Sequence, residues 1–328
     1  MPILVTGGAG FIGSHLCERL IARGHDVVAV DNFDPFYDPA IKRENLAALA
    51  GDPRFTLVEA DIRDPEALLA GVRAAGVDSC EVIVHLAARA GVRPSLEQPV
   101  EYSRTNLDGT TAVLELARAL GTRRFVFGSS SSVYGNNEKV PFAEADPVDY
   151  PISPYAATKR GGELICHTYH HLYGISTVCL RFFTVYGPRQ RPDLAIHKFA
   201  RLMAEGRPIP LFGDGSMKRD YTYIDDILQG VEGAIDFTAS DEPRFEIINL
   251  GESRTTTTAD LIQLIARGLG VEPVIDRQPV QPGDVERTYA DISKARRLLG
   301  YDPTTPVEEG LPKFIEWFLQ TRPSSRTK

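Results

Sequence analysis

A tyrosine and a lysine four residues apart, Tyr155 and Lys159, form the pair in this sequence best suited to acid–base chemistry. Ser153 and Pro154 directly before them are typical of an N-cap and a first helical turn, so the sequence predicts a helix with both side chains on one face. A free phenol, with a pKa near ~10, is a poor base at neutral pH, but an adjacent ammonium favours its charged form. We therefore expect Tyr155 to act as a general base and Lys159 to lower its pKa.

A run of serines supplies a third group. Ser129 to Ser132 follow the apolar stretch Phe125 to Phe127, which is typical of a strand. Ligands bind at the carboxyl ends of strands in open α/β sheets, so Ser130 is expected beside Tyr155, where it orients the substrate hydroxyl. Many helices carry a tyrosine and a lysine at this spacing by chance, and the serine run is what favours a catalytic function.

The N-terminal region predicts a phosphate-binding loop. The stretch GGAGFIG places Gly7, Gly10 and Gly13 between the first apolar strand and the first helix. Glycines so spaced permit a tight turn, close approach of the backbone to a pyrophosphate, and close packing of helix on strand. A glycine-rich loop alone is also compatible with a structural turn, and its position between strand and helix favours a dinucleotide site.

Asp31 favours NAD as the dinucleotide. It ends the second predicted strand, 18 residues after the last of these glycines, where a carboxylate hydrogen-bonds an adenosine ribose 2′-hydroxyl. The same charge repels the 2′-phosphate of NADP, and neither Asn32 nor Phe33 directly after it is basic. A loop aspartate without such a function is the alternative. Asp61 and Ile62, after the third predicted strand, are expected to meet the adenine, although a strand-end acid without function is also compatible.

These groups require a parallel sheet to position them. Short apolar runs alternate with helical patterns from Ile3 to Leu180, which predicts a doubly wound sheet with helices on both faces. After about residue 185 prolines and turns indicate a loop-rich unit, and the apolar run Ile247 to Leu250 indicates a return to the sheet. We expect a Rossmann-type α/β fold, with residues 1–185 and about 222–255 as the NAD-binding domain and about 186–221 and 256–328 as a smaller C-terminal α/β substrate domain.

Composition excludes several functions. The 328 residues carry 36 Lys and Arg against 44 Asp and Glu, a formal charge of −8, which argues against nucleic-acid binding. No apolar run approaches the ~20 residues of a membrane span, and the start from Met1 to Val5 lacks a basic signal-peptide region, so we expect a cytoplasmic protein. The four cysteines are scattered without metal-ligand spacing, so neither a metal site nor a disulfide framework is predicted.

Together these motifs resemble the extended short-chain dehydrogenase/reductase family. The resemblance rests on GGAGFIG, the Asp31 strand end, HLAA, SSSSVYG and PYAATK, and later stretches extend it over nearly the whole chain. Within this family the chain is most similar to nucleotide-sugar 4-epimerases, which hold NAD tightly and use a triad matched here by Ser130, Tyr155 and Lys159. The resemblance implies NAD contacts from Gly7, Gly10, Phe11, Ile12, Gly13, Asp31, Asn32, Asp61, Ile62, Leu86, Ala87, Ala88, Tyr155 and Lys159, with the lysine on the nicotinamide ribose.

The resemblance also indicates the sugar. Family dehydratases carry an acidic residue two positions before the tyrosine of VYG, where this chain has Ser132, which disfavours elimination. UDP-glucose 4-epimerases typically have Asn at the position of Thr184, whereas the run from Thr184 to Asp193 resembles UDP-glucuronate 4-epimerases. Arg191, with the hydroxyl donors Ser131, Ser132 and Thr184, is expected to hold a C5 carboxylate and hinder its loss as CO₂. An arginine that holds a diphosphate or a surface acid is the alternative.

Further residues are implied for the nucleotide. Arg219 matches the family arginine that meets the UDP pyrophosphate, and Asp284 matches an acid near the uridine ribose. Gln281 departs from the pattern, because many epimerases have a second diphosphate-binding arginine there; Arg287 or Arg191 replaces that charge, or the nucleotide is held less tightly. Arg93 is a further candidate for the sugar or the phosphate, with a solvated loop charge as the alternative.

The resemblance extends to assembly. The helices expected over Val100 to Leu120 and Tyr155 to Tyr173 correspond to those that pair across a family dimer, so we expect a homodimer. Two other functions remain open. One is epimerisation of a neutral sugar, UDP-glucose or UDP-N-acetylglucosamine. The other is a non-catalytic NAD-binding sensor, which is disfavoured because such proteins often lose the tyrosine or the lysine and this chain has both.

Overall fold

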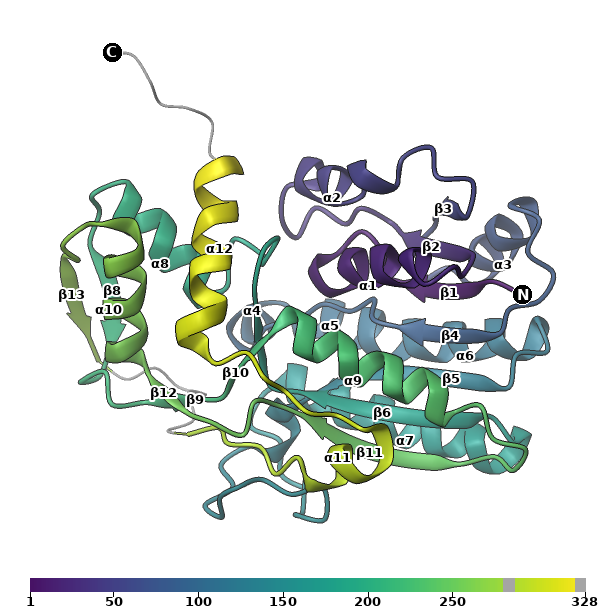
Figure 1. Cartoon of the computed structure of the whole chain (residues 1–328). Coiled ribbons are helices and arrows are strands. Elements are labelled where there is room, and N and C mark those ends of the chain that lie inside the picture. Colours follow the sequence, from purple (N-terminus) through teal and green to yellow (C-terminus); the bar gives the residue numbers. More distant parts are fainter. Residues whose placement is uncertain (280–286, 322–328) are drawn as a thin grey trace.

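A seven-stranded parallel sheet forms the centre of the computed structural model, which describes residues 1–279 and 287–321 (Figure 1). The strand order β11-β6-β5-β4-β1-β2-β3 reverses between β1 and β4, and sheets of this kind bind ligands at such a point, outside the carboxyl ends of the strands. The strands are β1 (Ile3–Thr6), β2 (Val27–Asp31), β3 (Phe55–Glu59), β4 (Val82–His85), β5 (Arg124–Ser130), β6 (Ser176–Phe182) and β11 (Phe245–Leu250).

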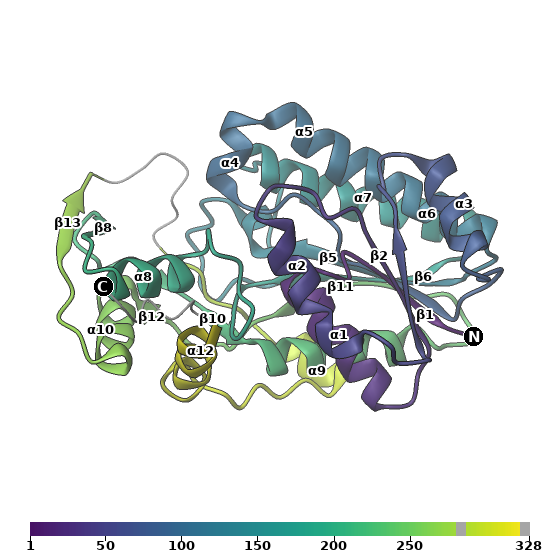
Figure 2. The same ribbon diagram turned by 90° about the horizontal axis from the view of Figure 1, so that it is seen from above.

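Helices cover both faces of this sheet, as the apolar strands predict (Figure 2). One face packs against α1 (Phe11–Ala22) and α9 (Ile224–Phe237), and the other packs against α3 (Pro65–Ala74), α6 (Gly109–Ala119) and α7 (Pro154–Tyr173). The Rossmann-type fold predicted from the sequence is therefore confirmed.

A second group of elements gathers at one end of the sheet (Figure 1). It contains three short strand pairs, and β11 then returns the chain to the large sheet beside β6, as the run Ile247 to Leu250 predicts. The pairs are β7 (Thr184–Tyr186) with β10 (Tyr221–Tyr223), β8 (Ile209–Phe212) with β13 (Ile275–Gln278), and β9 (Lys218–Arg219) with β12 (Thr256–Thr257). The helices of this group are α8 (Ala195–Ala204), α10 (Thr258–Leu269) and α12 (Val307–Thr321).

The helix expected from Val100 to Leu120 is not uniform. It consists of α5 (Pro99–Ser103), a π-helical turn (Arg104–Asp108) and α6. Within the π turn, the Asn106 side chain accepts from the Arg89 backbone N–H and donates to the Arg89 carbonyl, and π turns are frequent at functional sites. The remaining helices are α2 (Pro39–Asn45), α4 (Val92–Glu97), α11 (Ser293–Leu299) and two 3₁₀ turns (Ala47–Leu49 and Ser131–Tyr134).

Candidate active site

A cavity of about 410 Å³ lies at the carboxyl ends of β1 to β6. Loops that follow each of these strands contribute to its wall, so residues from widely separated parts of the chain face one space. All the predicted cofactor residues line it: Gly7, Gly10, Phe11, Ile12, Gly13, Asp31, Asn32, Asp61, Ile62, Leu86, Ala87, Ala88, Tyr155 and Lys159. The predicted substrate residues Ser130, Ser131, Ser132, Thr184 and Arg191 line it as well.

The glycine loop forms part of the cavity wall. Gly7 has a φ of +71°, and a Cβ there would lie 2.7 Å from the Ala87 backbone nitrogen. A Cβ at Gly13 would lie 2.1 Å from the Gly7 carbonyl oxygen, so neither position accommodates a side chain without backbone movement. Gly10 is the N-cap of α1, whose free N–H groups point towards an anion bound at this end. The loop therefore fits a pyrophosphate.

Asp31 lies at the end of β2 with a basic neighbour that the sequence argument missed. Its carboxylate is buried and accepts hydrogen bonds from the backbone N–H groups of Ala9 (3.1 Å) and Phe33 (2.9 Å). Lys42 Nζ lies 3.7 Å from Asp31 Oδ1, because the turn after β2 folds back into α2. The argument for NAD from the absence of a basic residue directly after Asp31 is therefore incomplete, because the fold places Lys42 beside this carboxylate.

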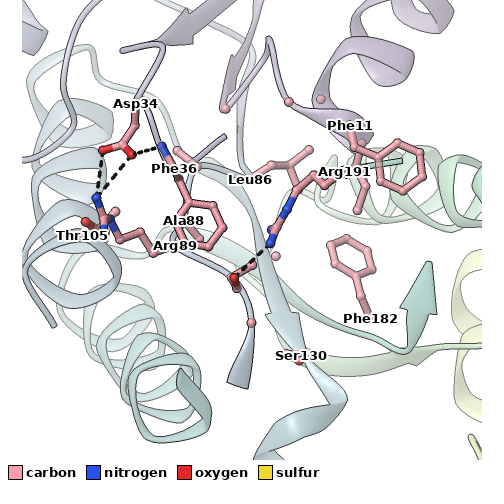
Figure 3. A pocket seen from close by; sticks show the side chains of 18 of the residues that line it. Phe11, Asp34, Phe36, Leu86, Ala88, Arg89, Thr105, Ser130, Phe182 and Arg191 are labelled. Carbon is pink, nitrogen blue, oxygen red and sulfur yellow. Dashed lines mark hydrogen bonds and ion pairs between the residues drawn. The ribbon is translucent and has the colours of Figure 1, made fainter. Parts of the chain in front are cut away.

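The cavity wall next to Asp31 contains ionic contacts of Asp61 and Asp34 that the sequence analysis did not identify. Burial would raise the pKa of Asp61, but hydrogen bonds from Arg63 and Asn32 outweigh it and hold that pKa at about 2. Arg89 Nη2 lies 3.3 Å from both carboxylate oxygens of Asp34 (Figure 3). Arg89 lies four residues after His85, the last residue of β4, and this position of a basic residue after a strand end is the sequence signal that could have identified it.

Tyr155 lies on α7 in contact with Ser130, as predicted. The helix begins with Ser153 as its N-cap, whose side chain accepts from the Ala156 backbone N–H at 3.1 Å. Burial raises the pKa of the Tyr155 phenol, and a hydrogen bond from Ser130 and the positive charge of Arg191 oppose this effect. Ser130 and Arg191 are thus the groups that oppose the effect of burial on the pKa of Tyr155, and the same effect expected of Lys159 stays a prediction.

The Lys159 side chain contacts the carboxyl end of β5. Its Nζ donates a 2.6 Å hydrogen bond to the Gly128 carbonyl and lies 5.0 Å from the centre of the Phe127 ring. Burial lowers its pKa to about 8. At neutral pH the side chain is therefore a cation inside the cavity wall, one helical turn after Tyr155.

A buried ionic cluster supports this strand end. Glu163, fully buried on α7, forms two hydrogen bonds with Arg181 of β6, at 2.8 and 2.9 Å. Ser129 Oγ donates to the same carboxylate at 2.6 Å, and Arg160 lies 3.1 Å from it. Sequence analysis did not single out Glu163 or Arg181, because nothing in their spacing indicates that they meet.

Arg191 projects into the cavity from the loop after β7 (Figure 3). Its Nη2 donates to the Ala90 carbonyl at 3.1 Å, and its guanidinium lies 5.2 Å from the centre of the Phe36 ring. Arg191 donates two hydrogen bonds to Asp193, at 2.7 and 3.0 Å. Burial lowers the pKa of Arg191, but these hydrogen bonds and the negative charge of Asp193 outweigh burial and raise it. The cavity therefore holds a permanent cation near Tyr155.

Two further predicted substrate residues, Arg93 and Arg219, are not among the residues that line the cavity. Arg93 on α4 stacks over the Phe212 ring at 4.4 Å, so it joins the sheet domain to the end of β8. Arg219 on β9 is half-buried and donates to the Lys218 carbonyl at 2.9 Å. Asp284 and Gln281 lie outside the described residues.

In residues 1–279 and 287–321, no group of three or more His, Cys, Asp or Glu side chains is placed to hold a metal ion. No helix in the same ranges is long and apolar enough to cross a membrane. All four cysteines are buried free thiols.

The sheet order, glycine loop and Ser130, Tyr155 and Lys159 together define an extended short-chain dehydrogenase/reductase. A family model described as GDP-mannose 4,6 dehydratase matches residues 4–314, and the chain belongs to this family.

Several relatives are named as epimerases of nucleotide sugars. The chain is 42% identical over 335 residues to a probable UDP-glucuronate 4-epimerase of Rhizobium meliloti, covering 98% of this chain and 97% of that protein. The UDP-glucuronic acid 4-epimerase of Bacillus cereus, solved with UDP-glucuronic acid and NAD, is similar with a TM-score of 0.89 and 37% identity, covering 98% and 100% of the chains. The UDP-glucose 4-epimerase of Thermotoga maritima, solved with UDP-glucose, has a TM-score of 0.86 and 35% identity, covering 98% and 99%.

Proposed function

We propose that this chain catalyses the NAD-dependent C4 epimerisation of a UDP-sugar and interconverts UDP-glucuronate and UDP-galacturonate. The observation that carries the proposal is the guanidinium of Arg191, only 14% exposed, in the cavity that Ser130 and Tyr155 also line. The names of the Rhizobium meliloti and Bacillus cereus relatives support the same substrate.

The residues of the cavity fit NAD. Gly7, Gly10 and Gly13 leave room for a pyrophosphate against the N-terminus of α1, and Asp31 is an acceptor for the adenosine ribose. When bound, NAD supplies reversible hydride transfer at the sugar C4 and a positive ring that favours the Tyr155 phenolate. We assign cofactor binding to residues 1–185 and about 222–255, with Lys159 on the nicotinamide ribose.

Proton transfer is assigned to Tyr155. It accepts the proton of the C4 hydroxyl as the sugar is oxidised and returns it as the sugar is reduced, and Ser130 positions that hydroxyl by a hydrogen bond. Burial raises the pKa of Tyr155, and Arg191, a permanent cation, opposes this rise and so favours the charged phenolate. Tyr155 and Ser130 serve both the oxidation and the reduction at C4. The keto sugar must therefore rotate between these two steps, so that hydride returns to the opposite face of C4.

The sugar carboxylate is assigned to Arg191 and Thr184. Arg191 Nε and Nη2 already donate to Asp193, and Nη2 also donates to the Ala90 carbonyl. The remaining nitrogen, Nη1, is therefore assigned the charge-assisted contact that holds the C5 carboxylate while C4 is a ketone, when such an acid is prone to lose CO₂. Ser131 and Ser132, which line the same cavity, are assigned as further hydroxyl donors to this carboxylate.

Elimination chemistry is disfavoured despite the description of the family model. The carboxylates among the lining residues are Asp31, Asp34 and Asp61, which follow β2 and β3. In the sheet, β4 and β1 separate these strands from β5, whose end carries Ser130. Ser132 stands where a dehydratase would carry its acid, so no lining carboxylate near Tyr155 is available for that proton.

The nucleotide is assigned to about residues 186–221 and 256–328. Arg219 is proposed to meet the UDP pyrophosphate and Asp284 the uridine ribose, with Arg93 as a further phosphate or sugar contact. Arg93 and Phe212 come from the two units and meet at 4.4 Å, which supports a binding site at their junction.

Incubation of the purified protein with UDP-glucuronate and, separately, with UDP-glucose tests this function, with no NAD added and the C4 epimers separated by chromatography. We expect UDP-galacturonate from the first and little UDP-galactose from the second. The opposite result would support a neutral-sugar epimerase, for which the Thermotoga maritima structure is a precedent. No product from either, even with added NAD, would support a binding protein without catalysis.

We propose that the chain forms a homodimer through α5 and α7. Val100 on α5 is 61% exposed and Leu164 on α7 is 53% exposed, which is unusual for apolar side chains on two adjacent helices. Leu164→Asp is expected to shift the mass measured by light scattering from dimer to monomer.

We also propose that the protein acts in the cytoplasm. Its four buried free thiols are compatible with a reducing compartment. Cell fractionation would test this, and recovery of the protein with secreted material would contradict it.

A further inference from the structure

The loop of residues 187–194, called the strap below, has three consecutive side chains that reach three different parts of the molecule. Arg189 contacts α1, Gln190 contacts β7 and α8, and Arg191 enters the cavity. The strap therefore links the cofactor helix, the second unit and the candidate sugar site.

The contact with α1 is an ion pair. Arg189 Nη2 lies 2.7 Å from Glu18 Oε1, and Arg189 Nη1 lies 3.5 Å from Ser14 Oγ. Arg189 and Glu18 are 21% and 29% exposed, so the pair is partly shielded from water. Arg189 also has a φ of +63°, a backbone conformation that residues other than glycine, asparagine and aspartate rarely adopt.

The other side of the strap is fixed by Gln190, which is 2% exposed. Its Nε2 donates to the Val185 carbonyl at 3.0 Å, and its Oε1 accepts from the His197 backbone N–H at 3.2 Å. With this side held, the pair between Arg189 and Glu18 determines how closely the strap lies against α1. Arg191, two residues after Arg189, donates to the Ala90 carbonyl on the loop after β4 (Figure 3).

We propose that Arg189 is a positioning residue: its ion pair with Glu18 holds the strap against α1, sets Arg191 across the cavity, and slows the escape of the bound dinucleotide. The part that concerns the sugar rests on the proposed function. The part that concerns the cofactor rests only on dinucleotide binding, because α1 carries both Glu18 and the N-terminus that receives the pyrophosphate.

Arg189→Asn is the decisive variant, because asparagine tolerates the left-handed backbone while it removes the guanidinium. Protein loaded with NAD is freed of excess cofactor by rapid gel filtration, and NAD release is followed by chromatography. We expect release about fivefold faster than in the wild type, and a KM for UDP-glucuronate raised by a similar factor with kcat within about twofold. Glu18→Gln should match this result, and the double variant should be no worse than either single one.

Two controls separate positioning from general destabilisation. Arg189→Lys keeps the charge and should restore most NAD retention. Arg23→Gln removes another ion pair of α1, the one with Glu232 on α9, and should leave NAD release and KM unchanged.

Unchanged NAD release and KM in Arg189→Asn would overturn the proposal, as would an equal effect of Arg23→Gln or additive effects of Arg189→Asn and Glu18→Gln. If the wild type epimerises neither sugar, the proposed function fails, while NAD release still decides whether Arg189 holds the cofactor. A wild type that binds no NAD would overturn both.

Discussion

Ser129 Oγ donates a 2.6 Å hydrogen bond to Glu163 Oε1, and this contact ties the end of β5 to the helix that carries Tyr155. The next residue, Ser130, lines the cavity with Tyr155, and its hydroxyl opposes the rise in the Tyr155 pKa that burial causes. Arg181 of β6 holds the same carboxylate through two hydrogen bonds. The geometry of the Ser130 and Tyr155 pair therefore depends on an ionic cluster that does not itself touch the substrate.

Glu163→Gln should destabilise the protein by about 3–5 kcal/mol, because it leaves the buried Arg181 without its counter-charge. Urea unfolding followed by circular dichroism measures this. Glu59→Gln, which breaks an exposed pair with Arg43, is the matched control and should leave the unfolding midpoint nearly unchanged. Equal effects of the two variants would show that the Glu163 cluster contributes no more than a surface pair.

Tyr155→Phe should lower kcat for UDP-glucuronate by about 10²–10⁴-fold while NAD stays bound, because only the proton acceptor is removed. Tyr102, whose ring centre lies 6.2 Å from that of Tyr155, provides a neighbouring phenol as control. Tyr102→Phe should reduce kcat by less than about tenfold, since it loses one hydrogen bond to the Ala90 carbonyl. Near-normal turnover by Tyr155→Phe would exclude the base function.

Activity should fall on the alkaline side as pH rises through about 8. Burial lowers the pKa of Lys159 to about 8, so the ammonium that holds the ribose and balances the phenolate loses its proton there. The measurement is kcat/KM from pH 6 to about pH 10, the range in which Lys159 loses its proton. Lys159→Arg keeps its charge throughout this range, so its residual activity should lack this decrease. A decrease near pH 8 in both proteins would assign it to another group.

Arg191→Ala should raise the KM for UDP-glucuronate by about 10–100-fold and change that for UDP-glucose far less, because hydrogen bonds to charged groups contribute the most. Arg201→Ala on α8, which removes a surface pair with Glu205, is the control. Equal losses on both sugars in Arg191→Ala would remove the carboxylate assignment.

Two neighbouring substitutions should move cofactor preference in opposite directions. Asp31→Asn should reduce the preference for NAD over NADP by about tenfold, since it removes the charge that repels a 2′-phosphate. Lys42→Met should increase that preference, because Lys42 Nζ lies 3.7 Å from Asp31 and would attract the phosphate. Equilibrium titration with both cofactors measures this, and shifts in the same direction would contradict the geometry.

The strands, the glycine loop and the Tyr155 helix were predictable from the sequence, because each depends on periodicity or on capping within a few residues. Lys42 beside Asp31 was not, since a turn of several residues has to fold back before the two meet. Arg89 against Asp34 and Glu163 against Arg181 were missed for the same reason. The pairing partner of a charged residue is set by how helices pack on the sheet, which local sequence patterns do not contain.

Epimerisation of UDP-glucuronate in D₂O, followed by proton NMR, tests the central claim most directly. Hydride that leaves and returns within one closed pocket does not exchange with solvent. We therefore expect UDP-galacturonate that retains protium at C4 and C5. Deuterium at C4, or no UDP-galacturonate at all, would contradict epimerisation by transient oxidation at the site of Ser130, Tyr155 and Lys159.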